Sequence, residues 1–215
     1  MDVDRYTLLR QLFYLLLMKP LLILLLGFNV RHFERLRAKG AHVIAANHNS
    51  HLDAMVLMKL FRFRDIPKVK LVAAKDYWCR TKLLEWVSLH IIGVIPIDRK
   101  GGNKDPLAPV MKALDDGYTI VIFPEGTRGD PEKRQPLKFG TAKIIETKPE
   151  ICVTPVFMHG LGKSLPRGEG LLVPFICEIN IGEDIAWKGD KKTLTLALEA
   201  SFADLEAEIA PKEWH

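Results

Sequence analysis

Beyond residue 40, short apolar runs alternate with segments in which apolar residues recur every three or four positions. Short runs of this kind predict strands, and the wider spacing predicts helices. The predicted strands cover residues 41–46, 69–74, 91–97, 119–123 and 151–157, with one or two more within 171–181. The predicted helices cover residues 51–61, 82–90, 107–114 and 141–146, and we expect the first of them to be amphipathic. A last predicted helix places five apolar residues on one face: Leu194, Leu198, Phe202, Leu205 and Ile209. The alternation predicts an α/β fold, in which helices flank a mostly parallel central sheet.

Residues 8–28 form the most apolar stretch of the chain. Lys19 and Pro20 divide it into two pieces, and each is shorter than the roughly 20 residues that a straight membrane span needs. Basic residues flank both ends, which favours a helical hairpin or interfacial anchor on the cytoplasmic face of the (inner) membrane. A kinked span and helices packed on a soluble domain remain alternatives. We therefore expect a membrane-associating helical segment at residues 1–39 and a separate domain at residues 40–215.

Charge and cysteine content narrow the class of partner. A formal charge of +5 and a pI near 9.1 favour anionic partners, such as phosphate groups or lipid headgroups. The three cysteines are far apart and form no CxxC pair, which indicates a reducing, cytosolic setting. No Walker-type or GxGxxG sequence is present, so nucleotide chemistry has little support.

Polar residues follow three of the predicted strands directly. His48 follows the first strand, Arg99 follows another, and the segment 124–128 follows a third. In parallel sheets, ligands bind beyond the carboxyl ends of the strands. We therefore expect these three polar clusters to share one rim of the sheet.

His48 and Asp53 allow three interpretations. Ser50 and Asp53 match a capping box, with Ser50 as N-cap and Asp53 at the third helical position. Alternatively, Asp53 accepts a hydrogen bond from one nitrogen of His48 and leaves the other nitrogen as a base. Both roles are compatible, because a carboxylate has two oxygens. A metal site would instead use His48, His51 and Asp53.

The segment "FPEGTRGD" (123–130) reads either as a strand followed by a Pro-Gly turn or as an anion site. A tight turn at Gly126 would present backbone N–H groups, and Arg128 would supply a fork-shaped donor for a phosphate. Glu125 would orient a substrate hydroxyl or an arginine. Together with Arg99, this segment predicts a phosphate pocket beside His48.

Four segments, taken in order, resemble the sequence blocks of the glycerolipid acyltransferase family, whose best-known members are the 1-acylglycerol-3-phosphate acyltransferases. They are "NHNSHLD" (47–53), "GVIPIDR" (93–99), "FPEGTR" (123–128) and "VTPV" (153–156). The resemblance spans residues 41 to 185 approximately, and it implies a glycerol-3-phosphate acyltransferase-like fold. One departure is that Gly129 and Asp130 follow Arg128, where family members often have serine.

The resemblance implies that residues 40–215 form an acyltransferase catalytic domain. His48 and Asp53 would be its catalytic dyad, and the block at 154–156 would be associated with the acyl donor. The substrate-binding residues would be Arg99, Glu125, Gly126, Thr127 and Arg128. His48 would take the proton from a lysophospholipid hydroxyl, which attacks the thioester of acyl-CoA or acyl-carrier protein. We expect phosphatidate formation from 1-acylglycerol-3-phosphate, with no cofactor, no metal and no nucleic acid partner, at a membrane surface.

Three alternatives remain at this point. In the first, the acceptor is a lyso-lipid other than 1-acylglycerol-3-phosphate. In the second, the chain is a metal-dependent hydrolase that uses His48, His51 and Asp53. A non-catalytic lipid-binding module would keep the apolar segment and the basic residues between 59 and 82, yet would not need both His48 and Asp53.

Overall fold

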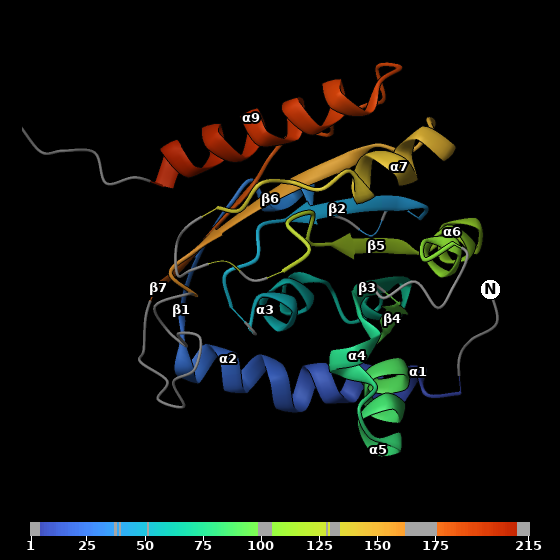
Figure 1. Cartoon of the computed structure of the whole chain (residues 1–215). Helices are drawn as coiled ribbons and strands as arrows, with labels where there is room; N and C mark the ends of the chain where they lie inside the picture. Colours follow the sequence, from blue (N-terminus) through green and yellow to red (C-terminus); the bar gives the residue numbers. More distant parts are fainter. Residues whose placement is uncertain are drawn as a thin grey trace, which may run out of the picture. The chain divides into compact units, whose positions relative to one another are not determined.

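In the computed structural model, the strands follow the order β1-β7-β6-β2-β5-β3-β4 (Figure 1). The structure describes residues 5–36, 38, 40–50, 52–98, 105–127, 129, 134–161 and 176–209. The strands within these residues are β1 (Gly27–Arg31), β2 (His42–Ala46), β3 (Val69–Ala74), β4 (Val94–Ile97), β5 (Thr119–Ile122), β6 (Val153–His159) and β7 (Ile176–Ile181). β3 pairs in parallel with β4 and β5, and β1 with β7, whereas β6 and β7 are antiparallel. The predicted mostly parallel sheet flanked by helices is therefore confirmed.

Helices connect most of these strands. The α-helices are α1 (Thr7–Leu12), α2 (Lys19–Leu25), α3 (Asp53–Leu60), α4 (Lys75–Trp78), α5 (Lys82–Trp86), α6 (Ala108–Asp115), α7 (Gly140–Thr147) and α9 (Lys191–Ile209). The π-helical segments are η1 (Phe13–Met18) and η4 (Val87–Ile92), and the 3₁₀ turns are η2 (Phe33–Arg35) and η3 (Ile66–Lys68).

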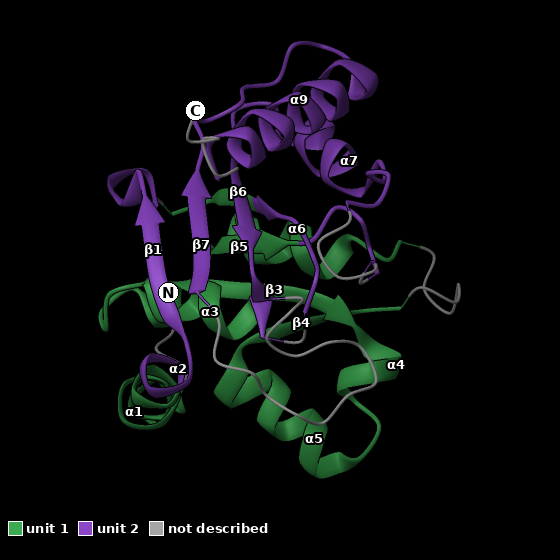
Figure 2. Cartoon of the chain, turned by 90° about the vertical axis from the view of Figure 1, so that its left-hand side faces the viewer, with its two compact units in different colours: residues 1–21, 37–44, 54–122 green, residues 22–36, 45–53, 123–215 purple. Residues whose placement is uncertain are grey.

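The chain divides into two compact units (Figure 2). Unit 1 contains residues 1–21, 37–44 and 54–122, and it carries β3, β4 and β5 with the helices that connect them. Unit 2 contains residues 22–36, 45–53 and 123–215, and it carries β1, β6 and β7. β2 contributes residues to both units, so its end at Ala46 belongs to unit 2. The predicted boundary after residue 39 stays a prediction.

In unit 2, α9 packs against β6 and β7. The five apolar residues predicted to share one face of this helix are all buried, as the spacing requires. Asp190 precedes the helix, and its carboxylate accepts hydrogen bonds from the backbone N–H and the hydroxyl of Thr193. These bonds satisfy an amide at the start of the helix that has no intrahelical acceptor.

The apolar N-terminal stretch differs from its prediction. Residues Thr7–Leu25 form one helix of 19 residues, which has the length and composition needed to cross a membrane. Pro20 does not break it, because the π-helical segment η1 lies directly before α2. A proline removes one N–H and crowds the preceding turn, and a wider π turn accommodates both effects. The expected division at Lys19–Pro20 is therefore wrong.

Two further differences concern burial and strand count. α3 is not amphipathic: every residue except Lys59 is buried, so nearly all its faces contact protein. β1 was not predicted, because the expected helical segment continued to Phe28, yet Gly27 to Arg31 pair in register with β7. Part of the strand region predicted at 171–181 lies outside the described residues, and β7 accounts for the remainder.

Candidate active site

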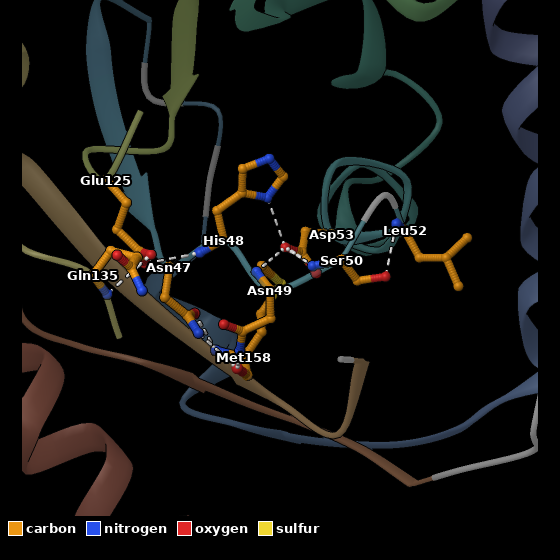
Figure 3. Close-up of polar contacts among 9 residues, drawn as sticks. All are labelled: Asn47, His48, Asn49, Ser50, Leu52, Asp53, Glu125, Gln135 and Met158. Atoms are coloured by element: carbon orange, nitrogen blue, oxygen red, sulfur yellow. Dashed lines mark hydrogen bonds and ion pairs between the residues drawn. The ribbon is translucent and has the colours of Figure 1, made fainter. Parts of the chain in front are cut away.

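His48 lies two residues beyond the end of β2, and the intervening Asn47 determines where the chain goes. The Asn47 side chain donates from Nδ2 to the Met158 carbonyl oxygen (2.8 Å) and accepts from the Met158 N–H (2.7 Å) (Figure 3). A single amide thus pairs with both backbone groups of one residue in β6, as a neighbouring strand would. Asn47 is 1% exposed, so water does not compete for these bonds.

The carboxylate of Asp53 is directed at the loop that carries His48. Its Oδ2 lies 2.8 Å from His48 Nδ1, and it also accepts hydrogen bonds from the backbone N–H groups of Asn49 (2.7 Å) and Ser50 (2.8 Å). Asp53 is fully buried. Among the described residues, its other oxygen, Oδ1, has no hydrogen-bond partner. One oxygen therefore holds the histidine and closes the loop.

The capping-box interpretation holds in part. Asp53 accepts from the Ser50 N–H, which is the acidic half of that motif. The Ser50 hydroxyl instead accepts from the Leu52 N–H (3.3 Å), not from Asp53. The hydrogen bonds expected from the capping and dyad interpretations are therefore both present, although one carboxylate oxygen makes them where two were expected, and the role of His48 as a base stays a prediction.

These contacts determine the tautomer of His48. An ionised carboxylate only accepts hydrogen bonds, so Nδ1 carries the proton and Nε2 keeps its lone pair. The Nε2 edge points away from Asp53 (Figure 3). The ring stacks on Phe123, with centroids 4.2 Å apart and planes inclined by 19°. His48 remains 21% exposed, and the buried Asp53 carboxylate orients its ring from the Nδ1 side.

The segment after β5 holds the backbone of His48 from both sides. Glu125 Oε1 accepts from the His48 N–H (3.0 Å), and the Gly129 N–H donates to the His48 carbonyl oxygen (3.2 Å). Glu125 Oε2 accepts from the Gln135 N–H (3.2 Å). The predicted meeting of the His48 and Glu125 clusters is thus observed, through main-chain hydrogen bonds.

Glu125 is buried, with 2% of its surface exposed. Burial raises the pKa of its carboxyl above the usual value, and the N–H groups of His48 and Gln135 act in the opposite direction. Its two oxygens accept from backbone groups, and its predicted contact with substrate stays a prediction.

The turn that carries Glu125 depends on Gly126. The Gly126 N–H donates to the Phe123 carbonyl oxygen (3.0 Å), and Pro124 occupies the second position of this turn, which prolines favour. Gly126 has φ = +73°, where a side chain is strained, and an added Cβ would lie 2.9 Å from Lys138 Nζ. Thr127 is exposed beside it.

Several predicted residues cannot be placed. Arg99, Arg128 and His51 lie outside the described residues, so the phosphate pocket and the metal site that used His51 stay predictions. Within the described residues, no group of three or more His, Cys, Asp or Glu side chains is arranged to hold a metal ion.

The block at 154–156 lies within β6 and is buried throughout. The Thr154 hydroxyl donates to a carboxylate oxygen of Asp184, and the Pro155 carbonyl oxygen accepts from the Gly182 N–H (2.8 Å). Both contacts connect β6 to the segment that follows β7, so the described part of this block contributes to the core of unit 2.

Three contributors were missed by sequence reasoning. Asn47 was seen only as a polar residue at a strand end, although a buried amide after an apolar run signals a backbone partner. Phe123 was assigned to a strand, and its stacking on His48 follows from the pairing of two distant segments. Gln135 acts through its backbone, so no side-chain signal exists.

Comparison with known proteins adds independent evidence. A 1-acyl-sn-glycerol-3-phosphate acyltransferase of Arabidopsis thaliana chloroplasts is 29% identical over 67% of this chain and 39% of its own length. The corresponding enzyme of Bos taurus (alpha form) is 26% identical over 81% of this chain and 62% of its own length. That of Helicobacter pylori is 33% identical over 55% of this chain and 48% of its own length. The chain thus spans less than two thirds of the length of these relatives.

The crystal structure of the 1-acyl-sn-glycerophosphate (LPA) acyltransferase PlsC from Thermotoga maritima has a similar fold. Its TM-score is 0.76 at 17% identity, with 97% of this chain and 81% of that chain covered. The sequence model of the family described as Acyltransferase matches residues 27–159, which is more than half of the chain and includes His48, Asp53 and Glu125. The chain therefore belongs to the Acyltransferase family.

Proposed function

We propose that the protein transfers a fatty acyl group from an acyl thioester to the hydroxyl of a lysophospholipid. The observation that carries this proposal is the 2.8 Å contact between His48 Nδ1 and Asp53 Oδ2, which leaves Nε2 available as a base. The relatives are named for acylation of 1-acyl-sn-glycerol-3-phosphate, so phosphatidate is the expected product.

The reaction needs no covalent enzyme intermediate. His48 Nε2 takes the proton from the acceptor hydroxyl as its oxygen attacks the thioester carbonyl carbon. The tetrahedral oxyanion then collapses, the carbon–sulfur bond breaks, and the thiolate leaving group receives the proton from the imidazolium. Asp53 stabilises the imidazolium and preserves the ring orientation, as the carboxylate does in a catalytic triad. The products are the ester and the free thiol of CoA or acyl-carrier protein.

The acceptor headgroup would be bound by arginines. Arg99 and Arg128 would hold the phosphate, and Gly126 and Thr127 would line the approach to it. The apolar helix at residues 7–25 supports attachment to a membrane. The basic residues that flank it favour the cytoplasmic face.

His48→Ala is expected to abolish acyl transfer, because no other described base is oriented by Asp53. The measurement is thiol release from acyl-CoA and from acyl-carrier protein, with a panel of lysolipids as acceptors. A positioned base contributes about 10²–10⁴-fold, so the loss should be at least that large. His32→Asn is the matched control: His32 is partly exposed and left-handed (φ = +58°), a conformation that asparagine tolerates.

Substantial activity in His48→Ala, with unchanged thermal unfolding, would exclude the proposed base. The same assay in EDTA tests the metal-dependent hydrolase, which would lose activity and would release fatty acid without forming a new ester. A lysolipid other than 1-acylglycerol-3-phosphate that is used best would identify a different acceptor class.

Arg128→Lys tests the headgroup. An ammonium cannot reproduce the two parallel bonds of a guanidinium to phosphate, so the acceptor KM should rise about tenfold or more while the donor KM stays constant. Arg134→Lys is the control, since Arg134 lies in the same unit and forms an ion pair with Glu206 (2.8 Å). An unchanged acceptor KM in Arg128→Lys would contradict the phosphate role.

A further inference from the structure

The corner formed by α4 and α5 in unit 1 exposes large apolar side chains. Leu83 is 72% exposed, Leu84 47% and Trp86 37%, and Tyr77 is exposed beside them. Isolated apolar residues on a surface are ordinary, whereas several exposed apolar side chains within one short segment indicate an interaction site. The group is local to residues 77–86, which we call the α4–α5 corner.

Two hydrogen bonds connect the backbone of the corner within itself and to the helix that follows. The Thr81 hydroxyl accepts from the Leu84 N–H (3.2 Å) and caps α5. The Ser88 hydroxyl donates to the Trp78 carbonyl oxygen (2.9 Å), which connects the end of α4 to η4. In η4, Ser88, Ile91 and Ile92 are buried. In the helix that begins at Lys82, the second half therefore packs on the rest of unit 1, and the first turn is exposed.

The same side of unit 1 carries the N-terminal helix. α1 contacts η4, and the Tyr6 ring lies 5.3 Å from Trp86 and 4.4 Å from His90. Within unit 1, α1 and α5 both lie at the lower end in Figure 2. Exposed leucines continue along this helix, and they are Leu8, Leu9, Leu12, Leu15, Leu16 and Leu17.

Charge and residue type identify the partner of this surface. Arg5, Lys75, Arg80 and Lys82 are exposed around the apolar group, against the two acidic residues Asp76 and Glu85. Trp and Tyr concentrate at the level of lipid headgroups, and long basic side chains extend from an apolar surface to anionic headgroups. A carrier protein would be bound mainly through the basic residues, whereas an anionic bilayer takes up both the basic residues and the exposed leucines.

We propose that the α4–α5 corner is a second membrane-binding element, which inserts Leu83, Leu84 and Trp86 at the headgroup boundary of an anionic bilayer beside the N-terminal helix. The helix and the corner together give unit 1 two lipid contacts, and two contacts define an orientation on the membrane that one helix alone leaves free. This inference does not depend on acyl transfer, and it concerns how the protein lies on its substrate surface.

The test uses the full chain with Trp86 as the only tryptophan, after Trp78→Phe, Trp187→Phe and Trp214→Phe. The protein is reconstituted into vesicles of phosphatidylcholine with phosphatidylglycerol, with and without bromine on the acyl chains near the headgroup. Bromine quenches tryptophan fluorescence only at close range. We expect at least a twofold loss of Trp86 fluorescence in the brominated vesicles, and a smaller loss when phosphatidylglycerol is omitted.

Leu83→Glu combined with Leu84→Glu should remove this quenching while circular dichroism and thermal unfolding stay unchanged. Leu196→Glu, at an exposed leucine of α9, is the matched control and should leave the quenching intact. The proposal is overturned if Trp86 in the parent chain is not quenched. It is overturned equally if the corner variants abolish self-association or carrier-protein binding and leave quenching unchanged.

Discussion

At the scale of single residues, the Glu125 carboxylate is coupled to His48 through a hydrogen bond from the His48 N–H. Glu125 was predicted from its position in "FPEGTR" to contact substrate, which stays a prediction, and its described contacts are with the N–H groups of His48 and Gln135. A buried carboxylate that accepts two backbone N–H groups fixes the position of the residues that donate them. We therefore expect any effect of Glu125 on acyl transfer to act through the position of His48.

Glu125→Gln has a pH signature with a defined sign. Burial raises the folded-state pKa, so the contribution of this carboxyl to stability is fully present below its unfolded value of about 4.3 and is lost as pH rises through the folded value. The difference in free energy of unfolding between wild type and Glu125→Gln should therefore fall as pH increases above about 4.3. Urea unfolding between pH 3 and 8 measures it.

Asp190→Asn is the control with the opposite sign. Hydrogen bonds from Thr193 lower the pKa of Asp190, so its contribution is present above the unfolded value of about 3.9 and is lost as pH falls through the lower folded value. If the wild-type advantage over Glu125→Gln increased with pH, the inferred effect of burial on Glu125 would be wrong.

At the scale of elements, the contact between β2 and β6 is extended by a side chain. Asn47 Nδ2 and Oδ1 pair with the carbonyl and N–H of Met158, and the Asn47 N–H also donates to Val156 (3.4 Å). The loop that carries His48 therefore leaves the end of β2 in one direction only.

Asn47→Ala should cost about 2–3 kcal/mol in free energy of unfolding, because it leaves the buried N–H of Met158 without an acceptor. Acyl transfer should fall as well, since His48 is the next residue. Asn29→Ala in β1 is the control, because its amide makes an exposed hydrogen bond to Glu178 (3.3 Å) and should change stability by less than about 0.5 kcal/mol. Equal costs for the two variants, measured by urea unfolding, would argue against the backbone-pairing role.

Elements with a strong local signal were predicted well. β3 has the predicted bounds, and α9 buries the predicted face, since both depend on periodicity within one segment. β1 and the continuous N-terminal helix were missed because the first depends on a partner nearly 150 residues away and the second on a π turn that tolerates Pro20. At the site, the pairing of His48 with Asp53 was predicted, whereas the stacking of Phe123 was not.

At the scale of the whole chain, the N-terminal helix is attached to unit 1 by a buried arginine. Arg10 is 3% exposed and donates from Nη2 to the Val69 carbonyl oxygen. Its guanidinium fits because Gly93 has no side chain: a Cβ there would collide with Nη2 and Cζ. One face of the helix therefore packs on protein, whereas most of its leucines remain exposed.

Gly93→Ala should loosen this attachment. Alanine is strained at φ = +85°, which costs about 1–3 kcal/mol, and its Cβ also displaces the guanidinium. Gly117→Ala isolates the first effect, because Gly117 has φ = +81° and no atom within 4 Å of an added Cβ. The midpoint temperature of thermal unfolding in detergent should fall further for Gly93→Ala than for Gly117→Ala. This additional decrease should vanish when Arg10→Ala is also present. An excess that persists there would show that Arg10 is not the cause.

The contacts that hold His48 in place have a consequence for the temperature dependence of turnover. The His48 N–H and carbonyl are both bonded, and the ring lies on Phe123 with Nδ1 held by Asp53. If His48 is the base, it should have little conformational freedom left to lose when substrate binds, because these contacts already order it in the folded protein. The activation entropy of the chemical step should then come mainly from the substrates. The largest contribution is expected from the acyl chain of the lipid, which loses conformational freedom when it binds.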